Sequence, residues 1–234
     1  YFGEGYMNQE ILITEGTIEQ LIDLITSCYE DFIQNNFIFR IYENFSGYIK
    51  IFQQLNEAVK SKQNVAHHYD LKEDLYKLFL DQDMQYSCAY FHNENISLDQ
   101  AQIDKKNHII NKLNITENMN VLDIGCGWGG MAIEIAKQTG ANVKGITLSE
   151  NQFNTASKRA QEEGLSDKIS FKIQDYRNET HKYDRIVSVG MFEHVGIKYF
   201  RTYLKKTYDL LKENGVFLLH TIGQRGIPTA TSPW

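Results

Sequence analysis

The segment 120–132, NVLDIGCGWGGMA, constrains the fold of this chain more than any other. A short apolar run contains Asp123, a cluster of glycines follows it, and a helical pattern begins after the cluster. This order predicts a strand, a tight turn and a helix. A turn of this kind brings backbone N–H groups and a helix N-terminus close to a bound cofactor. The segment therefore predicts a cofactor-binding fold with the turn after its first strand.

From residue 120 onward the chain alternates between strand and helix patterns. Strands are expected at 120–124, 142–148, 168–174, 183–189 and 216–221, and helices at 130–138, 150–163 and 199–211. The strands are nearly continuous apolar runs, which are typical of a parallel sheet covered on both faces. Glycines stand where the helices would end. These features predict a doubly wound, mostly parallel α/β fold.

The first half of the chain has helical patterns instead. One begins after Thr17, a suitable N-cap residue, and a second follows at 41–55. We expect part of a small helical N-terminal domain at 1–36, a helical lid at 37–119 and a cofactor-binding α/β core at 120–234. The chain begins without Met and provides five strands where this fold class has seven, so we expect a longer natural protein.

Composition excludes several classes of function. The formal net charge of −6 disfavours a nucleic-acid partner. Three cysteines without a CxxC pair disfavour a zinc site and a disulfide framework, and suit a reducing cytoplasm. The adjacent His67 and His68 lack a third spaced ligand and are a poor zinc site. No run of 18 apolar residues occurs in the sequence. We therefore expect a cytoplasmic protein with no metal.

The position of the acidic residue indicates which cofactor the glycine turn binds. A nicotinamide-binding domain usually has Asp or Glu at the end of its second strand, but here that strand ends in Thr147, Leu148 and Ser149. Asp123 instead precedes the glycines, in the pattern D-x-G-x-G-x-G that is typical of S-adenosylmethionine-dependent methyltransferases. The ammonium group of that cofactor suits a carboxylate. The alternative is a tight glycine turn in another α/β protein.

Four further stretches carry a family resemblance. They are HHYDLKEDLYKLFLDQDMQYSCAYF at 67–91, GITLSENQ at 145–152, YDRIVSVGMFEHVG at 183–196 and GVFLLHTIG at 215–223. Together with the glycine turn they resemble the cyclopropane-fatty-acid synthases, including the mycolic acid cyclopropane synthases, over residues 66–223. The resemblance implies a Rossmann-like class I methyltransferase fold. It also implies S-adenosylmethionine and bicarbonate as cofactors, with a cis double bond of a lipid acyl chain as the acceptor.

The resemblance also implies which residues hold S-adenosylmethionine. Four of them would lie at its methionine end: Asp123, Gly125, Gly127 and Gly129. The others would cover it or reach its ribose and adenine: Tyr86, Ser87, Thr147, Leu148, Gln152, Asp175 and Tyr176. The family commonly has a Gly-Trp pair where this chain has QDYR at 174–177, so no role is carried over to Arg177.

A bicarbonate site is implied at Cys88, Glu193, His220 and the backbone of Ile222. Bicarbonate would accept a proton from the transferred methyl group. Cys88 would act as a positioning group, and its alternative is a small buried hydrophobe; His220 could equally be a core histidine. The implied partner is an unsaturated phospholipid at the inner face of the membrane, and a homodimer stays open. The competing functions are an amine N-methyltransferase of the same superfamily and a non-catalytic binding module.

Overall fold

The chain divides into two compact units, residues 1–53 with 227–234 and residues 54–226. The computed structural model describes residues 2–35 and 73–223. The expected domain boundary at residue 36, the helical pattern at 41–55 and the pair His67 and His68 lie outside the described residues. Among the described residues, no helix is both long enough and apolar enough to cross a bilayer.

The described part of the first unit contains two helices, α1 (Phe2–Met7) and α2 (Ile18–Asn35). Thr17 begins α2 as predicted, because its Oγ1 atom accepts a hydrogen bond from the backbone N–H of Gln20 at 3.3 Å. The Gln20 side chain accepts one in return from the Thr17 N–H at 3.0 Å. This reciprocal pair is a capping box, which fixes where the helix starts.

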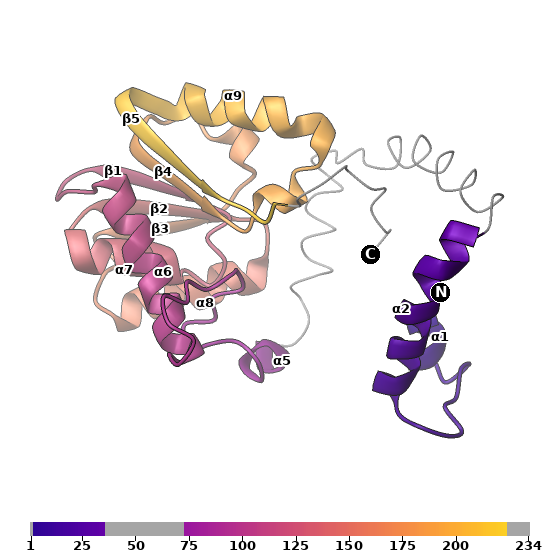
Figure 1. Cartoon of the computed structure of the whole chain (residues 1–234). Coiled ribbons are helices and arrows are strands. Elements are labelled where there is room, and N and C mark those ends of the chain that lie inside the picture. The colour runs from indigo at the N-terminus through magenta and orange to yellow at the C-terminus, as the bar shows by residue number, and fades with distance from the viewer. Residues whose placement is uncertain (1, 36–72, 224–234) are drawn as a thin grey trace. The chain divides into compact units, whose positions relative to one another are not determined.

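The second unit is built on a five-stranded parallel sheet in the order β3-β2-β1-β4-β5 (Figure 1). Its strands are β1 (Asn120–Ile124), β2 (Asn142–Thr147), β3 (Ile169–Ile173), β4 (Tyr183–Val189) and β5 (Leu211–His220). All five predicted strands are present. β5 begins earlier than predicted, but its regular pairing with β4 starts only at Val216 after an irregularity in the register. The predicted doubly wound fold is confirmed.

Helices cover both faces of this sheet. The helices of this unit are α5 (Glu73–Lys77), α6 (Leu98–Leu113), α7 (Gly130–Thr139), α8 (Glu150–Glu162) and α9 (Phe200–Leu210), with 3-10 helices η1 (Tyr176–Asn178), η2 (Phe192–His194) and η3 (Ile197–Tyr199). In Figure 1, α9 lies above the sheet while α6, α7 and α8 lie below it. The sheet is thus the middle of three layers.

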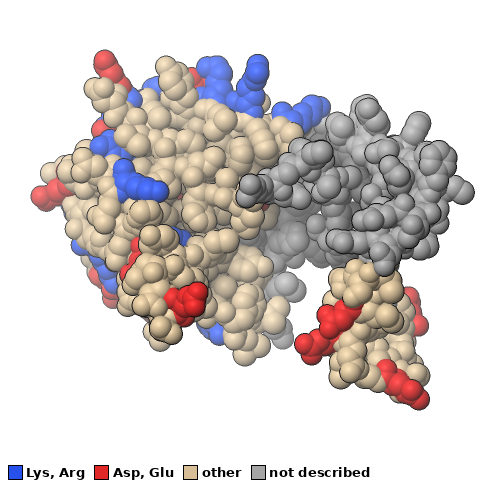
Figure 2. All heavy atoms as spheres, viewed as in Figure 1, with Lys and Arg blue, Asp and Glu red and all other residues tan. Residues whose placement is uncertain are grey.

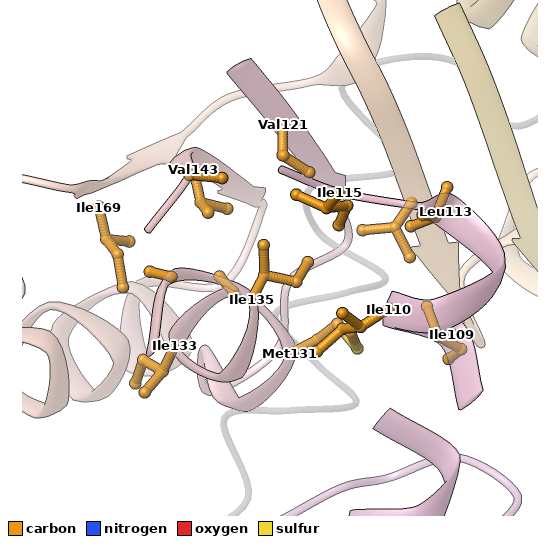
Figure 3. Packing of buried hydrophobic residues seen from close by; sticks show 14 of the residues in the cluster. Ile109, Ile110, Leu113, Ile115, Val121, Met131, Ile133, Ile135, Val143 and Ile169 are labelled. Atoms are coloured by element: carbon orange, nitrogen blue, oxygen red, sulfur yellow. The ribbon is translucent and has the colours of Figure 1, made fainter. Parts of the chain in front are cut away.

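The core alternates between the two faces of the sheet. Val121 packs with residues of α6 and α7, whereas its neighbour Leu122 packs with residues of α9 and η1. Figure 3 shows the first of these clusters, with Ile110 of α6 and Ile135 of α7 beneath the strands. Both valine and leucine are fully buried, which explains why the strands read as unbroken apolar runs.

Charge is unevenly distributed. Residues 2–35 contain several carboxylates and no Lys or Arg, and only acidic groups are visible on that part in Figure 2. Lys and Arg side chains gather in Figure 2 over the region where α9 lies in Figure 1. The net charge of −6 is therefore an average over unlike surfaces.

The topology indicates where a ligand binds. The chain builds β1, β2 and β3 in one direction and then crosses to β4 on the other side of β1. In sheets of this type the crevice at that reversal, outside the carboxyl ends of the strands, is the binding site. Here it lies at the ends of β1 and β4.

Candidate active site

The glycine turn leaves β1 with its backbone tied to β2. The N–H groups of Gly125 and Cys126 both donate to the Ile146 carbonyl, at 2.9 and 3.1 Å. Gly129 has φ +87°, and a Cβ atom there would lie 2.8 Å from Phe171. Gly127 has φ +53°, yet a Cβ atom there would meet nothing within 4 Å. The turn is thus packed on the Gly129 side and open on the Gly127 side, where a cofactor could approach the backbone.

Asp123 lies directly behind this turn. Its side chain is only 1% exposed, and its Oδ2 atom has no hydrogen-bond partner among the described residues. Burial raises the pKa of this carboxyl to about 7. A buried oxygen without a partner is costly, so an ammonium donor at this position would stabilise it. The residue therefore fits the cationic methionine end of the predicted cofactor.

Thr147, Leu148 and Gln152 lie together at the carboxyl end of β2. The Thr147 hydroxyl donates to Gln152 Oε1 at 2.7 Å, and both side chains are buried. Ser149 caps α8 by accepting the Gln152 N–H at 3.3 Å. These bonds fix the first turn of α8 beside the glycine turn.

Asp175 and Tyr176 follow β3 but face other protein groups. Asp175 caps η1 and holds the Arg177 guanidinium through both carboxylate oxygens, at 2.9 and 2.6 Å. Tyr176 is 7% exposed and meets the Tyr203 ring edge-on, with centroids 4.9 Å apart. Their assignment to adenine stays a prediction, and in this structure both side chains are engaged within the protein.

Tyr86 and Ser87 lie on the segment that precedes α6. The Lys105 ammonium donates to Ser87 Oγ at 2.7 Å, and Gln102 Nε2 donates to the Ser87 carbonyl at 3.0 Å. A Cβ atom at Gly190 would lie 3.3 Å from Ser87 Cβ, so this segment touches the end of β4. The Tyr86 side chain is half exposed and meets the Tyr76 ring edge-on. The structure thus brings the 86–88 segment to the carboxyl edge of the sheet.

Glu193, His220 and Ile222 converge at the same edge. The Ile222 N–H donates to Glu193 Oε1 at 2.6 Å, and the Gly190 N–H donates to the His220 carbonyl at 3.0 Å. His220 Nδ1 is buried without a hydrogen-bond partner among the described residues. Burial and the Lys105 charge lower the pKa of His220. Among the described residues, the site thus holds an unpartnered imidazole nitrogen near the Glu193 carboxylate, and in this structure Glu193 itself takes the Ile222 N–H.

Cys88 follows Ser87 directly and is exposed as a free thiol. It lies close enough to Lys105 for their charges to interact. The alternative interpretation of Cys88 as a buried hydrophobe is wrong, because the residue is exposed. Its assignment to the anion site stays a prediction.

Two buried lysines of α6 were missed by the sequence analysis. Lys105 is 3% exposed and Lys106 is 4% exposed. Lys105 stands four residues after Ala101 and four before Ile109, both buried, so the helical period could have indicated it. Lys106 Nζ bonds Asp83 Oδ2 at 2.7 Å, and Arg159 also pairs with Asp83. Arg159 in turn donates to the carbonyl of Trp128 in the glycine turn at 2.8 Å.

Comparisons with known proteins identify the family of this chain. The family model for mycolic acid cyclopropane synthetase matches residues 56–231. Cyclopropane-fatty-acyl-phospholipid synthase of Escherichia coli (strain K12) is 46% identical over 167 residues, which cover 71% of this chain and 42% of that protein.

Two solved structures are similar over the same region. The cyclopropane synthase MmaA2 from Mycobacterium tuberculosis matches with a TM-score of 0.66 and 38% identity, covering 68% of this chain and 56% of that one. The mycolic acid cyclopropane synthase CmaA1 complexed with SAH and CTAB matches with a TM-score of 0.65 and 36% identity, covering 68% and 55%.

The chain spans about half the length of these relatives. The family model nevertheless covers the glycine turn, the 86–88 segment and the ends of β4 and β5. The chain therefore belongs to the mycolic acid cyclopropane synthetase family.

Proposed function

We propose that this protein transfers a methylene group from S-adenosylmethionine to a cis double bond of an unsaturated phospholipid acyl chain, which forms a cyclopropane ring. The observation that carries this proposal is the cluster of Glu193, His220 and the Ile222 N–H at the ends of β4 and β5. It lies at the same edge of the sheet as the glycine turn. The names of the E. coli relative and of the structures solved for MmaA2 and CmaA1 support the proposal.

The residues at the end of β1 fit S-adenosylmethionine. Asp123 presents a buried carboxyl oxygen without a partner, and Gly127 leaves open space beside the backbone. We assign the methionine end to these residues and to Gly125 and Gly129. Thr147, Leu148 and Gln152 would line the path toward the ribose, and Tyr86 with Ser87 would cover the cofactor. When bound, the cofactor supplies an electrophilic methyl group on a sulfonium.

The reaction balances with bicarbonate as the proton acceptor. The alkene electron pair forms a bond to the methyl carbon as the carbon–sulfur bond breaks. A C–H bond of that methyl group would then break, its electron pair would close the ring, and bicarbonate held by the residues named below would accept the proton. Alignment contributes most to the first step because the leaving group is already charged. We assign the anion to His220, the Ile222 N–H, Glu193 and the Cys88 backbone.

We also propose that the reaction takes place at the inner face of the cytoplasmic membrane, where unsaturated phospholipids are available.

The test uses the full-length protein with S-adenosylmethionine and vesicles of unsaturated phosphatidylethanolamine. The lipids are hydrolysed and their acyl chains are analysed by mass spectrometry. Acyl chains that gain one CH₂ and lose the alkene support the proposal. Methylated headgroups with intact alkenes would instead identify an amine N-methyltransferase, and failure to bind S-adenosylmethionine in calorimetry would identify a non-catalytic module.

A further inference from the structure

Lys105 is a buried cation that has no carboxylate in contact with its ammonium group among the described residues. Its side chain lies on α6, the helix that packs against β5, and is 3% exposed. Among the described residues, its ammonium hydrogen-bonds one neutral group, the Ser87 hydroxyl at 2.7 Å, and pairs with no carboxylate. Its neighbour Lys106 differs, because it pairs with both Asp83 and Glu134. Burying an ammonium group that contacts no carboxylate is costly. An anion bound beside Lys105 would reduce that cost.

The groups around Lys105 belong to the candidate anion site. Ser87, its hydrogen-bond partner, touches Gly190, whose N–H bonds the His220 carbonyl. The positive charge of Lys105 acts on His220 and on Cys88. Three segments that are far apart in the sequence therefore meet around one ammonium group.

The carboxylates near Lys105 act on its charge without hydrogen-bonding its ammonium group. Asp81 and Asp83 influence the ammonium, but Asp81 accepts the backbone N–H groups of residues 83 and 85, and Asp83 pairs with Lys106 and Arg159. Burial lowers the pKa of Lys105 to about 8, so most of it is still charged at pH 7. Glu193 also acts on His220, with the opposite sign to Lys105.

A bicarbonate ion beside Glu193 would place two negative charges close together. Coulomb repulsion between them weakens binding unless a cation compensates. Among the described residues, Lys105 is the cation whose charge acts on His220, so it is placed to offset this repulsion. Its link to Ser87 also holds the 87–88 backbone at the site.

We propose that Lys105 is a positioning residue of the bicarbonate subsite. It offsets the negative charge of the bound anion and Glu193, and it fixes Ser87 and Cys88 against the end of β4. This inference rests on the proposed function, because it assumes that bicarbonate accepts the proton.

The first test measures how turnover depends on bicarbonate. The full-length protein is assayed with unsaturated vesicles in CO₂-free buffer to which bicarbonate is added in steps. We expect Lys105→Met to raise the half-saturating bicarbonate concentration about tenfold or more, while the Kd for S-adenosylmethionine changes less than about threefold. Lys105→Arg should recover part of the loss. Lys112→Met, which removes an exposed charge from the same helix, should leave the bicarbonate dependence unchanged.

The second test does not depend on activity. NMR titration of His220 in the protein without substrate should give a higher pKa in Lys105→Met than in the wild type, because a nearby positive charge has been removed. Ser87→Ala retains the charge and should leave the His220 pKa within a few tenths of its wild-type value.

The outcomes separate the two proposals. If wild-type turnover needs bicarbonate but Lys105→Met needs no more of it, the role of Lys105 is overturned. An unchanged His220 pKa in Lys105→Met overturns it as well. If the wild type forms cyclopropane at full rate without bicarbonate, the bicarbonate step of the proposed function fails instead.

Discussion

Among single residues, Asp123 shows most clearly how burial changes the acidity of a group in this site. Its carboxyl lies at the end of a central strand, where water cannot solvate it, and its pKa is raised to about 7. An acid whose pKa is raised in the folded state makes the protein less stable as the pH increases from about 4 to 7. A bound ammonium reverses this effect, because it favours the ionised carboxylate.

The affinity for S-adenosylmethionine should therefore increase as the pH rises from 5.5 to 7. Ionisation of Asp123 provides the charge that the cofactor's ammonium group binds. In Asp123→Asn the affinity should be at least about tenfold weaker at pH 7 and nearly constant over this range. Isothermal titration calorimetry at several pH values measures both. A wild-type affinity that does not change between pH 5.5 and 7 would show that Asp123 does not contact the charged end.

Glu193 should affect turnover rather than cofactor binding. It accepts the Ile222 N–H at the ends of β4 and β5, whereas Asp123 lies within β1. Glu193→Gln keeps the shape of the side chain but removes its charge, so we expect turnover to fall about a hundredfold or more. The Kd for S-adenosylmethionine should stay within about threefold of wild type. Equal losses in binding and turnover would place Glu193 at the cofactor instead.

The sequence singled out the motif residues as candidates but not the buried lysines. Asp123 and the glycines stand out because few other residues satisfy their position, and Glu193 and His220 stand out through the family resemblance. Lys105 and Lys106 were not singled out, since lysine is rarely buried, although the helical period aligns Lys105 with the buried Ala101 and Ile109. Their burial depends on the packing of the 81–88 segment over α6, which a local sequence pattern does not encode.

Among the secondary-structure elements, the strand–turn–helix unit at residues 120–139 determines cofactor access. Its strand and helix follow directly from apolar periodicity, so their ends were predicted to within one residue. The helix α6 was not identified individually, because Gln102, Lys105 and Lys106 interrupt its apolar stripe. Asp83 pairs with Lys106 of this helix and with Arg159. These ion pairs stabilise a helix whose apolar stripe is interrupted.

A methyl group added at Gly127 should block cofactor binding without unfolding the protein. The Cβ atom of Gly127→Ala meets no protein atom within 4 Å and projects into the space that we assign to S-adenosylmethionine. We expect at least about tenfold weaker binding by calorimetry.

Gly164→Ala is the matched control for Gly127→Ala. Gly164 also has a positive φ, +69°, and open space at its Cβ, but it lies after α8 and away from the turn. Both variants should lose about 1 kcal/mol of stability from the left-handed backbone, and only Gly127→Ala should lose affinity. Equal affinities in the two variants would contradict the placement of the cofactor.

We expect the ion pairs of Asp83 with Lys106 and Arg159 to hold the 81–88 segment against α6 and α8. Burial alone would raise the pKa of Asp83, but the Arg159 and Lys106 charges outweigh it and lower the pKa. Asp83→Asn leaves both cations short of a partner, so the free energy of unfolding should fall by about 2 kcal/mol at pH 7. This contribution is present above the usual pKa of Asp and is lost as the pH falls through the lowered pKa.

Urea unfolding at pH 7 measures that change. Lys137→Met, which removes the exposed Lys137–Glu163 pair, serves as the control and should cost less than about 1 kcal/mol. If both variants lose the same small amount, Asp83 is not an anchor of the segment.

At the scale of the whole molecule, the doubly wound topology explains how distant motifs form one site. The crossover from β3 to β4 places the glycine turn next to the end of β4, and β5 then adds His220 beside it. The alternation of strands and helices predicted a doubly wound fold, and the structure adds the order of the strands in the sheet. The side-chain contacts at the edge were not predictable in the same way, because they depend on how the 86–88 segment, Glu193 and Ile222 fold over the sheet.

The central claim is that a methylene group, and not an intact methyl group, reaches the alkene. The most direct measurement supplies the full-length protein with S-adenosylmethionine that carries a trideuterated methyl group, together with unsaturated phospholipid vesicles. Mass spectrometry of the acyl chains then counts the deuterium atoms transferred. We predict that the alkene is lost and that two deuterium atoms are retained, because the third leaves as the ring closes. Products that retain all three deuterium atoms, on the chain or on the headgroup, would contradict cyclopropane formation.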